Sequence, residues 1–181
     1  SGGCSSDRGL VVDCSRHFDA VKAYDAEAGT ITVEPGMVLE RLNTRVKADG
    51  WFFPVEPSTA TRCTIGGMAG NNSCGARSLR FGKMSDNVLA MEALFHDAEP
   101  FGFALTGNES SGVTGSARAE ELARRMLALA RENRQEILDK YPNVQRRVGG
   151  YNLDSLIEPR PNLPHLLVGS EGTPAAPTSV A

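Results

Sequence analysis

The segment from residue 57 to residue 82 constrains the fold most, because glycine and proline interrupt it too often for a long helix or strand. The interrupting residues are Pro57, Gly66, Gly67, Gly70, Gly75 and Gly82. Loops of this length in compact domains usually carry function. We therefore expect a long functional loop here, with one short helix around residues 68–72.

The paired glycines Gly66 and Gly67 indicate a backbone that can approach a ligand closely. Glycine has no Cβ atom, so a flat or phosphorylated molecule can lie against it, and its N–H groups can donate to anionic oxygens. Ile65 and Met68 bracket the pair with apolar side chains that a solvated loop does not need. The alternative is an ordinary surface loop, since glycine and asparagine are common in such loops.

Hydrophobic periodicity on both sides of this segment predicts a mixture of strands and helices. Strands are predicted at residues 10–13, 21–24, 30–34, 88–95 and 101–105, a helix at 37–48, and a polar turn at 108–115. This order of elements is typical of an α+β domain and not of regular βαβ alternation.

Residues 116–141 predict one amphipathic surface helix that begins at a Ser116 cap and ends before Pro142. The apolar residues that recur along it are Leu122, Met126, Leu129 and Ile137. We expect this face, with Leu129 on it, to be buried against the core.

Composition excludes several classes of partner. The formal net charge is -3 with no basic run, so nucleic acid is not expected, because phosphate binding needs clustered Lys and Arg. No stretch approaches the roughly 20 apolar residues of a membrane span. The four cysteines show no C-x-x-C spacing, so we expect reduced thiols, no metal site and a cytoplasmic location.

Several motifs follow one another in order over nearly the whole chain. They are Pro57-Ser58-Thr59, Ile65-Gly66-Gly67-Met68, residues 71–78, Arg80-Phe81-Gly82-Lys83, Arg146-Arg147-Val148, Gly150-Tyr151-Asn152-Leu153 and residues 167–173. Together they resemble the FAD-linked oxidase family, with the vanillyl-alcohol-oxidase or PCMH type of FAD-binding domain. Within this family the sequence is most similar to D-2-hydroxyacid dehydrogenases related to D-lactate and D-2-hydroxyglutarate dehydrogenases, in the subgroup with a C-terminal iron–sulfur region.

The resemblance implies an α+β PCMH-type FAD-binding domain, a mixed sheet with flanking helices that is truncated at both ends. Residues 1–181 are then part of that domain, and the substrate cap domain and the iron–sulfur domain are absent. FAD is the implied cofactor. The residues that the resemblance places around it are Pro57, Ser58, Thr59, Ile65, Gly66, Gly67, Asn71, Asn72, Ser73, Gly75, Arg80, Gly82, Val88, Glu171, Gly172 and Thr173.

Two departures from the family pattern concern the ends of the chain. Only Ser1-Gly2-Gly3 remains of the glycine-rich turn before the first strand, which should weaken diphosphate binding. Residues 174–177 bring two prolines where the family continues with an apolar strand, so no strand is expected there. The resemblance also implies that Gly3 and Gly172 both lie at FAD, beside Gly66 and Gly67.

The expected parent enzyme oxidises a D-2-hydroxy acid to the 2-oxo acid, with FAD as the electron acceptor. A small 2-hydroxy acid would bind only with the cap domain, which supplies the catalytic residues in the family. No catalytic residue is identified here; His17, His96 and His165 lie in no matching motif. This chain alone should therefore be inactive. The alternative is a non-catalytic or decayed module that keeps the fold without binding FAD.

Overall fold

A single sheet of six strands forms the centre of the computed structural model, which describes residues 12–105, 112–144 and 146–181. The strands are Val21–Asp25 (β1), Thr30–Val33 (β2), Ala90–Leu94 (β3), Pro100–Ala104 (β4), Val113–Gly115 (β5) and Ala176–Val180 (β6). Their order is β1-β2-β6-β3-β4-β5, and all of these pairings are antiparallel.

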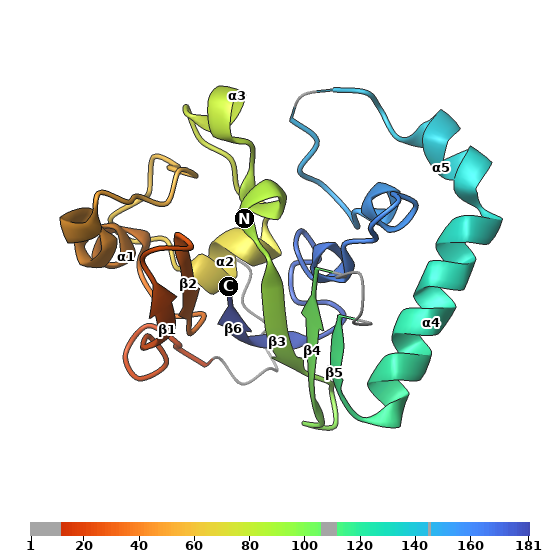
Figure 1. Ribbon diagram of the computed structural model, residues 1–181, viewed down its shortest axis with the longest axis horizontal. Helices are drawn as coiled ribbons and strands as arrows, with labels where there is room; N and C mark the ends of the chain where they lie inside the picture. Colours follow the sequence, from red (N-terminus) through yellow and green to blue (C-terminus); the bar gives the residue numbers. More distant parts are fainter. Residues whose placement is uncertain (1–11, 106–111, 145) are drawn as a thin grey trace.

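Helices flank the sheet, and the α+β class is confirmed. They are Leu39–Val46 (α1), Ile65–Gly70 (α2), Ser78–Phe81 (α3), Ala117–Glu132 (α4) and Arg134–Lys140 (α5). Short 3-10 helices cover Lys47–Asp49 (η1), Met84–Asn87 (η2), Leu153–Leu156 (η3) and Leu163–Leu166 (η4). Figure 1 shows α1 beside the β1–β2 hairpin at one end of the sheet and α4 beside β5 at the other.

The first hairpin and α1 confirm their predictions for local reasons. The Asp25 carboxylate accepts hydrogen bonds from two N–H groups of the turn, and Gly29 adopts a positive φ of 66° that residues with a Cβ atom disfavour. Along α1, Leu39, Leu42 and Val46 recur at helical spacing and are buried.

Strand β6 corrects the expectation that residues 174–177 cannot lead into a strand. It lies between β2 and β3, in the centre of the sheet, although it contains Pro177. The register is irregular there: Glu92 pairs with Ser179, and Ala93 pairs with Pro177. Proline lacks an N–H group, and a bulge is a position where a sheet tolerates that loss. The prediction was wrong because a bulge depends on the partner strand.

The predicted helix at 116–141 is two helices, which meet at Asn133. The expected burial of Leu129 is also wrong, because its side chain is 49% exposed whereas Ile137 is only 6% exposed. The buried residues of α4 are the small ones, Ala119, Ala123 and Ala130. Strand β4 and the residue after β3 already supply the large rings of Phe101, Phe103 and Phe95, so the helix contributes alanines to the shared core.

Other boundaries differ from the expectation in smaller ways. The segment 57–82 holds two short helices, α2 and α3, and α2 begins at Ile65, earlier than predicted. Val113–Gly115 is a strand and not a turn. Residues 10, 11 and 108–111 lie outside the described residues, while Val12 and Asp13 belong to no strand.

The different exposures of Leu129 and Ile137 predict different losses of stability when each side chain is shortened to alanine. Ile137→Ala should lower the free energy of unfolding by about 2–5 kcal/mol, because it empties a buried site. Leu129→Ala should lower it by about 1 kcal/mol or less, since half of that side chain already contacts water. Urea unfolding of both variants measures the difference, and equal losses would contradict the observed helix orientation.

Candidate functional site

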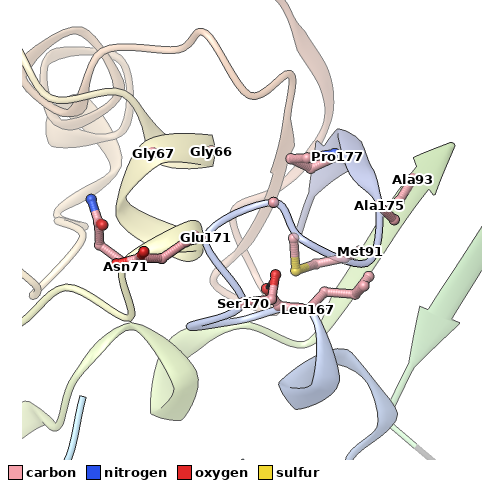
Figure 2. A pocket seen from close by; sticks show the side chains of 12 residues that line it. Gly66, Gly67, Asn71, Met91, Ala93, Leu167, Ser170, Glu171, Ala175 and Pro177 are labelled. Carbon is pink, nitrogen blue, oxygen red and sulfur yellow. Dashed lines mark hydrogen bonds between the residues drawn. The ribbon is translucent and has the colours of Figure 1, made fainter. Parts of the chain in front are cut away.

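A cavity of about 310 Å³ lies between α2, β3 and the segment that leads into β6 (Figure 2). Its lining residues are Gly66, Gly67, Gly70, Asn71, Met91, Ala93, Leu167, Ser170, Glu171, Gly172, Ala175 and Pro177. Three segments that are far apart in the sequence therefore share one concave surface.

The two glycines at the start of α2 serve this cavity in different ways. A Cβ atom on Gly66 would lie 2.4 Å from Cβ of Pro35, so Gly66 allows a close backbone contact inside the core. Gly67 is exposed to the cavity, and a Cβ atom there would meet only the Thr64 hydroxyl, at 3.1 Å. A side chain at Gly67 would thus extend into the cavity.

The backbone N–H groups of this pair already have acceptors within the protein. Gly66 donates to the Pro35 carbonyl at 2.8 Å, and Gly67 donates to the Thr64 hydroxyl at 3.3 Å. We expected these groups to donate to an anionic ligand, and the structure instead uses them to fix α2. Close approach of the backbone is what the glycines contribute.

A tight turn, Ser170 to Thr173, forms the opposite wall. Thr173 N–H donates to the Ser170 carbonyl at 3.1 Å, while Glu171 and Gly172 have positive φ angles of 53° and 77°. Glu171 N–H also donates to the Gly70 carbonyl at 2.9 Å, which ties the turn to the C-terminal end of α2. Figure 2 shows Glu171 next to Asn71 at that end of the helix.

The expected meeting of residues 171–173 with the glycine pair is therefore confirmed for Glu171 and Gly172, which share the cavity with Gly66 and Gly67. Gly3, the third expected partner, lies outside the described residues. Asn71 is the fifth predicted site residue that the structure brings to this cavity.

The lining suits a molecule that is flat and apolar in one part and polar in another. Met91 and Leu167 offer apolar side chains, whereas Asn71, Ser170 and Glu171 offer polar ones. Ligand sites of this kind combine apolar walls with a few placed polar groups.

Three further predicted residues lie behind these walls. Ile65 belongs to the core, and Thr173 closes the Ser170 turn. Asn72 is fully buried at a positive φ of 46°; its side-chain carbonyl accepts from the Ser85 N–H, and its Nδ2 has no hydrogen-bond partner within the described protein.

The other predicted residues do not line the cavity, and their contact with a cofactor stays a prediction. They are Pro57, Ser58, Thr59, Ser73, Gly75, Arg80, Gly82 and Val88. Each has a structural setting of its own: Val88 is buried in the core, Gly82 ends α3 at a φ of 78°, and Arg80 lies over the Phe81 ring.

Sequence reasoning missed several lining residues. They are Gly70, Met91, Ala93, Leu167, Ser170, Ala175 and Pro177. Met91 and Ala93 alternate with Glu92 along β3, which indicates a buried face. That pattern could have selected them as inward residues, but not as neighbours of α2.

His165 joins two parts of the chain through side-chain contacts outside the cavity lining. Its Nε2 faces the Ser85 carbonyl, and its Nδ1 lies 2.7 Å from the Ser155 hydroxyl. With Nε2–H donating to the carbonyl, Nδ1 accepts from the hydroxyl, so the neutral ring satisfies both contacts. Burial lowers the pKa of His165 and outweighs the Ser85 carbonyl, Asp86 and Asp154, which raise it; Lys83 also lowers it.

Other kinds of site find no support among the residues that the structure describes. No group of three His, Cys, Asp or Glu side chains gathers there as metal ligands would. In the same residues, no helix has the length and apolar character needed to cross a membrane.

The glycine geometry predicts two different responses to added methyl groups. Gly66→Ala should destabilise the fold by about 1–3 kcal/mol, because the new atom overlaps Pro35. Gly67→Ala should change the free energy of unfolding far less, since only the Thr64 hydroxyl must shift. Thermal unfolding of the two variants checks this, and a stable Gly66→Ala protein would contradict the close contact.

His165 predicts a dependence of stability on pH. Its pKa is lowered in the folded protein, so the unfolded chain takes up the proton first as the pH falls. The free energy of unfolding should therefore be highest, as far as it depends on His165, at pH values above the ordinary pKa of 6.5. It should decrease as the pH falls below that value.

Unfolding measured at several pH values in wild type, His165→Gln and His96→Gln tests this. His165→Gln should flatten the dependence near pH 6.5. His96 is exposed, so the His96→Gln control should keep it. An unchanged slope in His165→Gln would show that other groups cause it.

Known proteins resemble this chain in sequence and in fold. A family model described as FAD binding domain matches residues 1–101. The D-2-hydroxyglutarate dehydrogenase of Pantoea ananatis (strain AJ13355) is 35% identical over 179 residues, covering 94% of this chain and 17% of that protein. The enzyme of the same name from Escherichia coli (strain K12) is 32% identical over the same shares. The chain thus spans about a sixth of the length of these curated relatives.

Among solved structures, one titled alkyldihydroxyacetonephosphate synthase in P212121 resembles the chain with a TM-score of 0.56 at 16% identity. The match covers 97% of this chain and 22% of that one. At this identity the likeness concerns the fold alone.

Proposed function

The chain belongs to the FAD binding domain family, and from that membership we propose that it holds FAD for an enzyme that oxidises a D-2-hydroxy acid to the 2-oxo acid. The observation that carries the substrate class is the match over 94% of the chain to D-2-hydroxyglutarate dehydrogenases. A substrate that resembles 2-hydroxyglutarate is therefore favoured over other hydroxy acids.

The cavity fits part of this cofactor. Gly67 and Gly70 leave room where side chains would stand, and Ala93 and Ala175 keep the remaining walls shallow. Apolar contact from Met91 would suit a flat ring. When bound, FAD would supply the electron acceptor for oxidation of the carbon that bears the hydroxyl group.

The charge of the lining indicates which part of FAD belongs here. Glu171 is a lining residue whose side chain lies beside Asn71, and its carboxylate would repel a phosphate group at short range. The Gly66 and Gly67 amides are bonded within the protein and so are not spare donors for phosphate. The Ser170 hydroxyl donates to the Leu167 carbonyl and so can only accept. Asn71, Glu171 and the Ser170 oxygen suit hydroxyl groups and ring nitrogens, so we assign the cavity to a ring or sugar portion of FAD and not to its diphosphate.

Substrate binding belongs to the rest of the enzyme in this proposal. Residues 1–181 form part of the FAD-binding domain, and a cap domain beyond it would bind the 2-hydroxy acid and supply the catalytic base. A cytoplasmic location is part of the same proposal, supported by the unpaired thiols of Cys14, Cys63 and Cys74.

Titration of the cofactor-free chain with FAD tests the proposal. Binding should quench flavin fluorescence, and it should stabilise the fold by about 2.7 kcal/mol when free FAD is a hundredfold above its dissociation constant. Gly67→Val should abolish binding, because its side chain enters the cavity, while Leu129→Ala should bind normally. A folded wild-type chain that shows neither quenching nor stabilisation would instead support the alternative of a module that does not bind FAD.

A further inference from the structure

We propose that Tyr151 is a positioning residue for the cofactor wall: through Thr173, its hydroxyl group holds the Ser170–Thr173 turn in the shape that brings Glu171 to the cavity. This inference rests on the proposed function, because it concerns how the chain prepares its FAD site. Tyr151 itself does not line the cavity.

The turn has a shape that its sequence does not favour. Glu171 has a φ of 53°, in the left-handed region where a Cβ atom crowds the neighbouring carbonyl oxygen. A non-glycine residue keeps this conformation only when its surroundings hold it there. The hydrogen bonds of the turn are therefore the contacts that can hold Glu171 in this conformation.

A relay of hydroxyl groups supplies such a restraint. The Thr173 hydroxyl donates to the Ser170 carbonyl at 2.7 Å, which closes the turn a second time beside the backbone hydrogen bond. The Tyr151 hydroxyl lies 2.7 Å from the same Thr173 oxygen. A hydroxyl group has one proton to give, so Thr173 must accept from Tyr151 while it donates to Ser170.

Tyr151 can act as an anchor because its carbonyl group and the residue that follows it are both held by hydrogen bonds. Its carbonyl accepts from the Tyr141 hydroxyl at 2.9 Å, and the Tyr141 ring lies under the Arg147 guanidinium. The next residue, Asn152, is buried and donates to the Val168 carbonyl at 2.8 Å.

The ring and the hydroxyl group of Tyr151 have separate contacts. The ring helps to line an apolar groove with Leu153 and Leu166. The hydroxyl group reaches Thr173. Tyr151→Phe should therefore keep the packing of the ring and remove only the restraint on the turn.

Release of the turn should weaken cofactor binding without unfolding the protein. If the turn leaves the conformation that binds FAD for part of the time, the apparent affinity for FAD falls in proportion to the fraction of molecules that still have that conformation. One exposed hydrogen bond is a small restraint, so we expect the dissociation constant for FAD to rise about three- to tenfold in Tyr151→Phe.

A double-mutant cycle with fluorescence titration of FAD tests the relay. Tyr151→Phe and Thr173→Val should each weaken binding, and the double variant should be no weaker than Thr173→Val alone, because both changes break one chain of bonds. Thr173→Ser keeps the hydroxyl group and should restore affinity. Tyr24→Phe is the matched control, since its hydroxyl donates to Asp49 and not to a residue of the turn.

Hydrogen exchange in the cofactor-free protein gives a second readout. The Glu171 and Thr173 amides are bonded in the turn, so both should exchange faster in Tyr151→Phe while the midpoint of thermal unfolding stays nearly unchanged. Unchanged affinity and exchange in Tyr151→Phe, or additive effects in the cycle, would overturn the role of Tyr151. A wild-type chain that does not bind FAD would overturn the proposed function and, with it, the cofactor role of the turn.

Discussion

The insertion of β6 between β2 and β3 is the interaction on which the rest of the molecule depends. Val180 pairs with Val33 on one side and with Met91 on the other, so in the described part of the chain strand pairing connects the β1–β2 hairpin to the rest of the sheet through β6. Backbone hydrogen bonds between Ala181 and Ala90 extend the pairing. Because β6 lies in the centre of the sheet, the segment before it runs beside α2. The cavity lies between that segment, α2 and β3.

The cavity is held mainly by backbone contacts and not by pairs of side chains. The N-terminal end of α2 is fixed where Gly66 donates to Pro35, and the C-terminal end where the Gly169 and Glu171 amides donate to carbonyls of α2. Such contacts need a close approach of two backbones, which is why glycine occupies position 66. The shape of the site is therefore set by the fold before any side chain that lines it.

Local patterns predicted much of this structure, and long-range packing decided the rest. The hairpin turn at Gly29 and the apolar stripe of α1 depend on neighbours in sequence, so they could be predicted. The strand containing Pro177 could not, because the bulge that tolerates proline needs β3 beside it. At the site, the glycine pair and Glu171 were predicted from motifs, whereas Met91 was missed, since alternation shows that a residue is buried but not what it faces.

The position of the cavity has a consequence for how binding and folding are coupled. Its walls come from α2, from β3 and from the segment that ends in β6, the strand that joins the two parts of the sheet. A molecule bound between them adds contacts across the junction where β6 pairs with both neighbouring strands. Since a ligand that binds only the folded state stabilises that state, FAD bound here would stabilise this junction as well as fill the cavity. The hydroxyl relay from Tyr151 acts on the same wall, so the order of the turn and the stability of the junction would rise together.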